Sequence, residues 1–145
     1  MDDVLKLDDF LCFAVYAAGH ALTRVYKPLL DAIGLTYPQY LVMVVLWQEE
    51  DQTVGQIGEK LFLESSTLTP LLKRLESAGL VQRARSAADQ RQVHVVLTEA
   101  GKALQARAAE IPACLLAATG GDMAHLRQLT TALTQLRMTL DGAAS

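Results

Sequence analysis

The hydrophobic positions of the chain recur mostly with the period of an α-helix. One apolar stripe at spacings of three and four predicts a long first helix over residues 7–29. The members of that stripe are Leu7, Leu11, Ala14, Ala18, Leu22, Val25 and Leu29. A second helix is expected after Thr36, because Pro38 suits a first helical turn and residues 41–47 form an apolar run.

The middle of the chain predicts two short helices and then a hairpin. A helix over residues 53–62 precedes a second helix over residues 65–78. Two strand-like runs follow over residues 80–85 and 92–97, joined by a polar loop. Helix, turn, helix and hairpin in this order are typical of a winged helix-turn-helix domain.

Two further helical patterns complete the chain. Residues 98–111 predict a helix that Pro112 kinks or interrupts. A narrow leucine-rich stripe with polar flanks predicts the last helix. The members of this stripe are Met123, Leu126, Leu129, Leu133, Leu136 and Leu140. The pattern therefore predicts a mainly α fold with a small β-hairpin.

Composition adds an expectation of dimerisation. Of the 145 residues, 51% are apolar and only 6% aromatic, so the apolar stripes are mostly leucine, alanine and valine. Such a chain has more apolar surface than one small domain covers by itself, which favours a homodimer. We expect a single domain over residues 1–145, with the winged helix-turn-helix at about 36–98 and dimerisation helices at 1–35 and 99–145.

The net charge of −3 is unevenly distributed. Residues 65–94 carry five basic and two acidic side chains, whereas the remainder carries eight basic and fourteen acidic ones. A basic island on an acidic body indicates a phosphate-binding surface. No apolar run approaches the length of a membrane span, and residues 1–10 are acidic rather than signal-like. We therefore expect a cytoplasmic protein with no membrane partner.

The helix at 65–78 and the hairpin carry the side chains that a DNA reader needs. Short hydroxyl side chains can approach base edges, basic ones can grip phosphates, and Asp89 can orient Arg91 toward a narrow minor groove. The predicted contacts with double-stranded DNA are Ser65, Ser66, Thr67, Thr69, Lys73, Arg74, Arg85, Asp89 and Arg91. The alternative is that the hydroxyls only cap an amphipathic helix and that the hairpin tip is a solvated turn.

The stretch from Val54 to Gly101 resembles the MarR family of transcriptional regulators. The resemblance is carried by TVGQIGEKLFLESSTLTPLLKRLESAGLV, by the DQRQVHVVLTEAG wing and by the helix after it. The order of elements on either side matches as well. The resemblance implies a homodimer with interleaved terminal helices, whose two winged domains read a palindromic operator and whose binding represses transcription.

Cys12 and Cys114 are the two cysteines, and a cytoplasmic setting argues against a permanent disulfide. On a regular helix Cys12, Tyr16 and Tyr26 fall within an arc of about 80°. Tyr26 lies about 21 Å from Cys12 along the axis, whereas an antiparallel partner chain could bring its own Cys12 there. A cysteine oxidises through its thiolate, which hydroxyl donors such as Tyr37 stabilise. The alternative is that Cys12 is a small buried hydrophobe.

The segment LDDFLCFAVYAAGHALTRVYKPLLDAIGLTYPQYLVM is similar to the N-terminal part of the organic-hydroperoxide-sensing (OhrR-type) branch of this family. The resemblance implies that Cys12 reacts with peroxide, that Tyr26 and Tyr37 hydrogen-bond to it and that Tyr16 borders the peroxide pocket. In two-cysteine members a cysteine of the partner chain then forms a disulfide. Cys114 is the candidate, about one turn before the usual position. Otherwise the sulfenic acid of Cys12 pairs with a small thiol or oxidises further.

These inferences predict a repressor that leaves its operator when an organic hydroperoxide oxidises Cys12. Oxidation would rotate the winged domains and break a half-site spacing of about 34–36 Å. One rival is a MarR-type repressor released by a small phenolic ligand at the dimer interface. Another is a thiol peroxidase, which is disfavoured because the chain has no CxxC motif. The histidines lack metal-ligand spacing, so we expect no enzyme, no cofactor and no metal.

Overall fold

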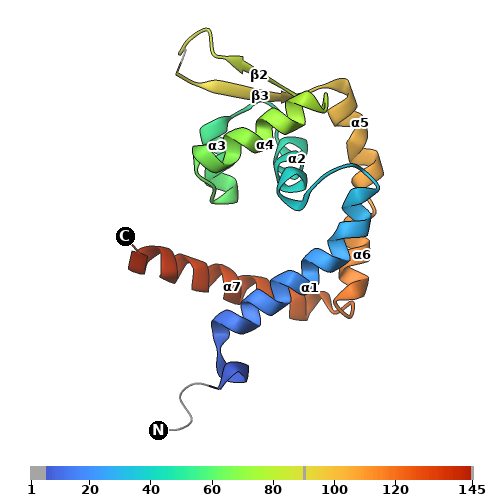
Figure 1. Cartoon of the computed structure of the whole chain (residues 1–145), viewed down its shortest axis with the longest axis vertical. Coiled ribbons are helices and arrows are strands. Elements are labelled where there is room, and N and C mark those ends of the chain that lie inside the picture. The colour runs from blue at the N-terminus through green and yellow to red at the C-terminus, as the bar shows by residue number, and fades with distance from the viewer. Residues whose placement is uncertain (1–5, 90, 145) are drawn as a thin grey trace. The chain divides into compact units, whose positions relative to one another are not determined.

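The computed structural model describes residues 6–89 and 91–144 (Figure 1). The chain divides into two compact units, the first ending at Ala109 and the second beginning at Glu110. The fold is mainly helical with a small antiparallel sheet, as the sequence predicts. Residues 1–5 of the expected N-terminal segment and Gln90 of the expected hairpin loop lie outside the described residues.

The first unit contains five α-helices in its described part. These are α1 Leu11–Asp31, α2 Tyr37–Gln48, α3 Val54–Leu61, α4 Ser65–Ser77 and α5 Glu99–Ala108. The predicted helix at 7–29 is wrong at its start. A 3₁₀ helix spans Leu7–Asp9, and the extended backbone of Phe10 separates it from α1. At its other end, α1 continues past Pro28 to Asp31.

Local side-chain chemistry explains where α2 and α3 begin. The Thr36 hydroxyl accepts from the Gln39 backbone N–H, and the Gln39 side chain accepts from the Thr36 N–H. Thr53 and Gln56 form the same reciprocal pair at the start of α3. Such capping boxes satisfy backbone donors that the first helical turn leaves unpaired. Both helices therefore begin where the sequence predicts.

The core of the first unit lies between α2, α3, α4 and the sheet. Its largest fully buried side chains are Val42, Met43, Leu46, Gln52, Ile57, Leu68, Leu72, Leu75, Val81 and Val95. At the edge of this core the Trp47 Nε1 donates to the Gly101 carbonyl oxygen over 2.9 Å. A side chain at Gly101 would collide with the Leu80 carbonyl, so glycine allows α5 to pack tightly beside the base of the hairpin.

The sheet has strand order β1-β3-β2, and both pairings are antiparallel. β2 spans Val81–Arg85 and β3 spans Val93–Leu97, close to the predicted hairpin. The sequence did not predict β1, Gln52–Thr53, a two-residue strand that pairs with His94 and Val95. In Figure 1 the hairpin extends beyond α3 and α4 as a wing.

The second unit contains α6, Ile111–Ala118, and α7, Met123–Ala144. The helix expected over residues 98–111 is interrupted close to Pro112, as predicted, but it ends earlier, because α5 stops at Ala108 and α6 begins at Ile111. Pro112 lies in the first turn of α6, where its missing N–H leaves no helical hydrogen bond unmade. Gly120 and Gly121 have positive φ angles of 97° and 80° and separate the two helices.

Candidate nucleic-acid interface and redox site

α4 carries its polar side chains on the side that faces solvent. Its buried side consists of Leu68, Leu71, Leu72 and Leu75. The predicted contacts that are exposed on it are Ser65, Ser66, Thr67, Lys73 and Arg74. Thr69 is half-buried, and its hydroxyl donates to the Ser65 carbonyl oxygen over 2.8 Å. Glu64 holds the N-cap position without a side-chain cap bond, so no hydroxyl group caps this helix. The hydroxyl side chains at the start of α4 therefore do not serve as its N-cap, which was the alternative to a role in DNA binding.

The wing ends in a charged tip. The Asp89 carboxylate accepts from the Arg91 backbone N–H over 3.0 Å and from its Nε over 3.4 Å. The Arg91 side chain is 93% exposed. The expected pairing of Asp89 with Arg91 is present, and it orients a guanidinium group that extends into solvent.

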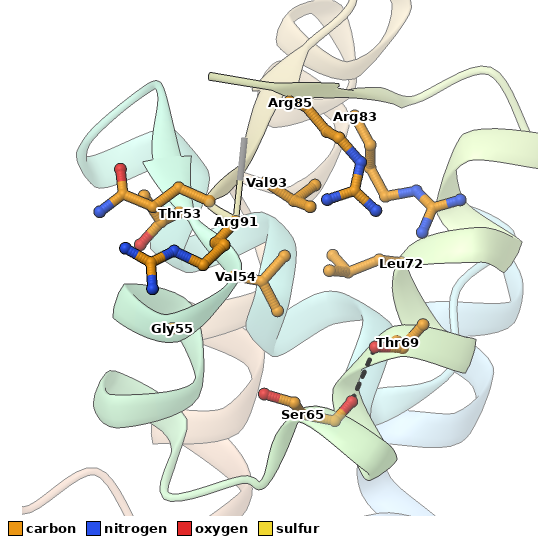
Figure 2. Close-up of a pocket in the computed structure, with 11 residues that line it drawn as sticks. Thr53, Val54, Gly55, Ser65, Thr69, Leu72, Arg83, Arg85, Arg91 and Val93 are labelled. Carbon is orange, nitrogen blue, oxygen red and sulfur yellow. Dashed lines mark hydrogen bonds between the residues drawn. The ribbon is translucent and has the colours of Figure 1, made fainter. Parts of the chain in front are cut away.

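A groove of about 580 Å³ lies between α4 and the wing (Figure 2). Its walls come from the start of α3, from α4 and from both strands of the hairpin. The lining residues are Thr53, Val54, Gly55, Ser65, Thr69, Leu72, Arg83, Arg85, Arg91, Gln92 and Val93. Figure 2 shows Arg85 pointing into this space from β2, across from Ser65 and Thr69 on α4. Guanidinium and hydroxyl groups on one concave surface fit the backbone of a nucleic acid.

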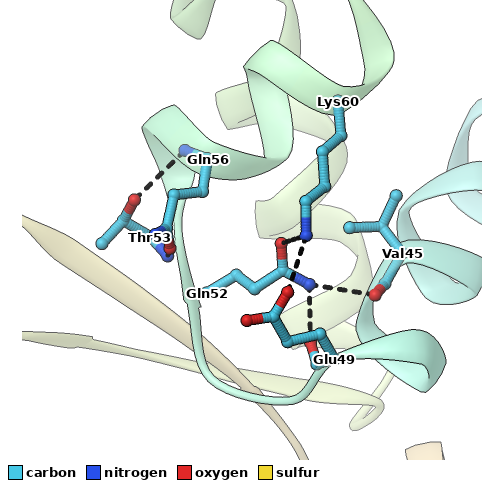
Figure 3. Close-up of polar contacts among 6 residues, drawn as sticks. All are labelled: Val45, Glu49, Gln52, Thr53, Gln56 and Lys60. Carbon is cyan, nitrogen blue, oxygen red and sulfur yellow. Dashed lines mark hydrogen bonds and ion pairs between the residues drawn. The ribbon is translucent and has the colours of Figure 1, made fainter.

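A buried amide holds the start of α3 in place beside this groove. The Gln52 side chain is almost fully buried, and its Nε2 donates to the carbonyl oxygens of Val45 and Glu49 (Figure 3). Its Oε1 accepts from the Lys60 Nζ over 2.7 Å, and the same ammonium pairs with the Glu49 carboxylate over 2.9 Å. Both polar atoms of the buried amide are satisfied, so the network ties α2, β1 and α3 into one rigid support.

The groove brings together only part of the predicted DNA contacts. The predicted residues among its lining are Ser65, Thr69, Arg85 and Arg91. Sequence reasoning missed Arg83 and Gln92, which also line it. Strand periodicity would have found Arg83, because residues two apart on a strand share a face and Arg85 was already a candidate.

A second cavity, of about 500 Å³, lies along α1 near the start of α2. Its lining residues are Val15, Tyr16, Gly19, His20, Leu22, Thr23, Tyr26 and Tyr37. The ring centroids of Tyr26 and Tyr37 are 4.8 Å apart. Burial, the neighbouring Tyr37 and Tyr40, and a hydrogen bond with Tyr37 raise the pKa of Tyr26 to about 12. Tyr26 therefore keeps its proton to a higher pH than an ordinary tyrosine does, and a protonated phenol is a hydrogen-bond donor.

Cys12 and Cys114 are both free and exposed in the single chain. Cys12 lies in the first turn of α1 and does not line the tyrosine cavity. Tyr16, one turn later, packs edge-on against His20 at a centroid distance of 4.3 Å. Cys114 lies in α6, within the second unit. The structure thus gathers the three predicted tyrosines at one cavity, while the approach of Cys12 to them and its pairing with Cys114 stay predictions.

The remaining titratable groups form no further cluster of metal ligands in the described part of the chain. Over residues 6–89 and 91–144, no three His, Cys, Asp or Glu side chains gather as a metal site. Within the same ranges no helix combines the length and the apolar character that crossing a membrane requires. The His94 Nδ1 lies 2.8 Å from the Asp51 carboxylate, which links β3 to the turn after α2.

The α3–α4 helix-turn-helix, followed by the β2–β3 wing with a basic groove between them, defines a winged-helix DNA-binding protein. A family model described as transcriptional regulator SarA/Rot matches residues 24–107. The chain belongs to the MarR family of transcriptional regulators, within the branch that its N-terminal segment resembles.

Relatives over nearly the whole chain support this assignment. The chain is 46% identical over 138 residues to the organic hydroperoxide resistance transcriptional regulator of Bacillus subtilis (strain 168), covering 95% of this chain and 94% of the relative. It is 49% identical over 143 residues to the HTH-type transcriptional regulator TtmR of Methylorubrum extorquens (strain PA1), covering 99% and 73%.

Among solved structures, the chain is similar to AbfR of Staphylococcus epidermidis. Reduced AbfR bound to DNA aligns with a TM-score of 0.82 at 35% identity, over 93% of this chain and 92% of that one. AbfR with its disulfide formed aligns with a TM-score of 0.64 at 38% identity, over 91% and 88%. The family resemblance and the fold class predicted from the sequence are confirmed.

Proposed function

We propose that the chain is a redox-sensing repressor that binds a palindromic operator as a homodimer and leaves it when an organic hydroperoxide oxidises Cys12. The observation that carries this proposal is the tyrosine cavity, which offers hydroxyl donors and apolar walls but has no thiol among its lining residues. On a straight α1, Cys12 lies about 21 Å from Tyr26 along the axis. The thiol that completes the cavity therefore comes from a second copy.

The terminal helices support a homodimer. Large apolar side chains that are more than a third exposed on α1 include Leu11, Phe13, Val15 and Leu22. Those on α7 include Leu129, Leu133, Met138 and Leu140. A two-fold partner would cover part of this exposed apolar surface and would pair two winged domains, which fits a palindromic DNA site. The DNA-bound structure of the similar AbfR supports DNA as the ligand of the groove.

The proposed oxidation consumes one peroxide for each Cys12. The thiolate attacks the terminal oxygen of the hydroperoxide, so that the S–O bond forms as the O–O bond breaks. The departing alkoxide takes up a proton and leaves as an alcohol, and Cys12 becomes a sulfenic acid. Tyr26 and Tyr37 serve as hydroxyl donors to the thiolate before this step, and the added oxygen disturbs that contact.

The second step closes a disulfide. The Cys114 thiol of the partner attacks the sulfenic sulfur of Cys12, and the hydroxyl leaves with the thiol proton as water. AbfR has been solved with a disulfide formed, which supports a reaction of this kind in a similar chain. If a small thiol attacks instead, the product is a mixed disulfide. Either product leaves Cys12 oxidised, so we propose a sensor and not an enzyme.

The test compares DNA binding of three forms before and after a stoichiometric dose of cumene hydroperoxide. The wild-type chain should release DNA and bind it again after treatment with a dithiol reductant. Cys12→Ser should bind DNA within about twofold of the wild type and should not respond, because a serine hydroxyl cannot be oxidised in this way. Release of the Cys12→Ser variant by the peroxide would overturn the proposal.

Cys114→Ser separates the two possible second steps. Non-reducing electrophoresis and intact mass should show a covalent dimer of the wild-type chain after oxidation and none for Cys114→Ser. A covalent dimer that persists in Cys114→Ser would exclude the Cys12–Cys114 pairing. A wild-type chain that gains only the mass of an added small thiol would assign the second step to that thiol.

The same cavity supports a second candidate function, a repressor released by a small phenolic ligand. Its volume lies within the range of small-molecule pockets, and tyrosine hydroxyls beside apolar walls suit an aromatic ring with a hydroxyl group. Salicylate is the probe. Release of the wild type and Cys12→Ser alike by salicylate, with no release by peroxide, would favour this candidate over the redox sensor.

A further inference from the structure

One ion pair joins α4 to the wing and involves none of the predicted DNA contacts. The Glu76 carboxylate accepts from the Arg83 backbone N–H over 3.1 Å and from the Arg83 Nη2 over 3.1 Å. These hydrogen bonds, from the Arg83 side chain first and its backbone second, hold the pKa of Glu76 below its usual value. The backbone and the side chain of Arg83 are therefore both tied to the end of α4.

Arg83 is less available to a ligand than Arg91, another arginine of the groove. Its side chain is only 25% exposed, whereas that of Arg91 is 93% exposed. Its Nε is buried and has no hydrogen-bond partner among the described residues. Figure 2 shows Arg83 lying against α4, while Arg85, from the same strand, points into the groove. Arg83 is thus bound to α4, and its charge is already paired with Glu76.

The wing needs such a tie because its connection to α4 is short and bends sharply. Gly79, in this connection, has a φ of 78°, a left-handed conformation that glycine adopts without strain. A wing tip reaches the minor groove only if its direction is set while α4 lies in the neighbouring major groove. Once α4 has bound the major groove, a wing that already points toward the minor groove meets it at a high effective concentration.

We propose that Glu76 is a positioning residue for DNA binding, which holds Arg83 and thereby sets the wing so that one half-site is read by α4 and the wing together. The proposal rests on DNA binding through these two elements and is independent of the peroxide response. Glu76 would then be a carboxylate that favours the binding of a polyanion.

The sign of the effect of removing the Glu76 charge decides between two explanations. If the carboxylate acts only as a charge, its removal lessens repulsion from the phosphates and strengthens DNA binding. If it positions the wing, its removal weakens binding although the protein becomes less negative. Glu64 provides a matched control, because it is an exposed acid next to Ser65 of the groove and makes no side-chain cap bond.

The experiment measures binding to a duplex that the wild-type chain selects from a random library, over a series of salt concentrations. Glu76→Gln should weaken binding roughly fivefold to twentyfold, because the charge-assisted bonds to Arg83 are lost. Glu64→Gln should bind as tightly as the wild type or up to about twofold more tightly. The salt dependence of Glu76→Gln should match the wild type, whereas Arg91→Gln should lower the slope by about one. Binding by Glu76→Gln as tight as that of the wild type overturns the proposal.

A second measurement separates positioning from loss of stability. Some base substitutions in the duplex should weaken binding of the wild-type chain but not of Arg91→Gln. Those base pairs are the part of the site that the wing contacts. Glu76→Gln should lose discrimination at those positions and keep it at the positions read by α4. An equal loss on every duplex would mean that Glu76 acts only on folding, and would overturn the positioning role. If the wild-type chain selects no duplex at all, DNA binding itself fails, and this inference fails with it.

Discussion

Two leucine-rich helices of this chain have similar spacing and opposite surroundings. α4 buries its four leucines in the core of the first unit, three of them fully. α7 repeats apolar residues at helical spacing, yet none of its residues, all described, is buried. Its Leu129 and Leu133 are 46% and 49% exposed. The same pattern thus lies in a core in one helix and on an exposed face in the other, and the proposed dimer would cover the second.

α1 contains both situations within one helix. Near its end, Leu30 is buried in the first unit, whereas Leu11 and Leu22 are exposed. Tyr26 lies between these two parts, half-buried, and the tyrosine cavity forms there. We therefore place the proposed sensor at the boundary between the chain's own core and its proposed dimer interface. At such a boundary a change at one residue can alter how the two copies are arranged.

The buried stripe should show the largest effect on folding. Leu72 is completely buried, so Leu72→Ala leaves a cavity in the core of the first unit. We expect the free energy of unfolding to fall by about 2–5 kcal/mol, measured by urea denaturation followed by circular dichroism. Lys73→Ala, one position later and exposed, is the control and should change it by less than about 0.5 kcal/mol. A similar decrease in the free energy of unfolding for both variants would show that the buried side of α4 does not pack into the core.

The exposed stripe should instead affect association. Leu133→Gln removes an apolar side chain that the chain itself leaves half exposed. Burial of one leucine contributes about 1.5–3 kcal/mol and counts twice in a two-fold dimer, so the dissociation constant of the dimer should rise by about a hundredfold or more. Sedimentation equilibrium over a dilution series measures it, and Gln135→Ala on the same helix is the control. A wild-type chain that stays monomeric throughout would refute the proposed dimer.

The fold was predictable where the signals are local. Thr36 and Thr53 bond to residues three positions later, and the α4 leucines repeat every three or four residues. β1 gave no such signal, because a strand of two residues has no periodicity. Its Gln52 is buried by contacts with Val45 and Lys60, which belong to two different helices. A buried polar residue of this kind is recognisable only after the elements around it are placed.

In the candidate sites too, contacts between residues close in sequence could be predicted, whereas contacts that depend on the fold could not. Asp89 and Arg91 are two residues apart in one turn, so their pairing could be predicted from sequence. Glu76 and Arg83 are seven residues apart on a helix and a strand, and their pairing depends on the path of the chain at Gly79. The partner of Cys12 cannot be derived from one chain's pattern at all, because the proposed contact is between two copies.

The smallest expected effect concerns Tyr26, at the boundary within α1. Its pKa is raised from an ordinary value of 10.0 to about 12, chiefly by burial. Between these two values an unfolded chain has lost the phenolic proton and the folded chain has kept it. The free energy of unfolding should therefore fall as the pH rises from about 10 to about 12, and Tyr26 should make it no more dependent on pH below that window.

Spectrophotometric titration of the four tyrosines checks this directly in the folded protein. The component that titrates highest should lie well above the ordinary range, and Tyr26→Phe should remove it, although burial also raises the pKa of Tyr40. Tyr16→Phe, at a residue that is 64% exposed, should leave that component in place. If all four tyrosines titrate together near their ordinary value, the Tyr26 hydroxyl is not shielded by burial. If the high component also disappears in the monomeric Leu133→Gln variant, the shielding of Tyr26 comes from the partner copy rather than from this chain's own α2.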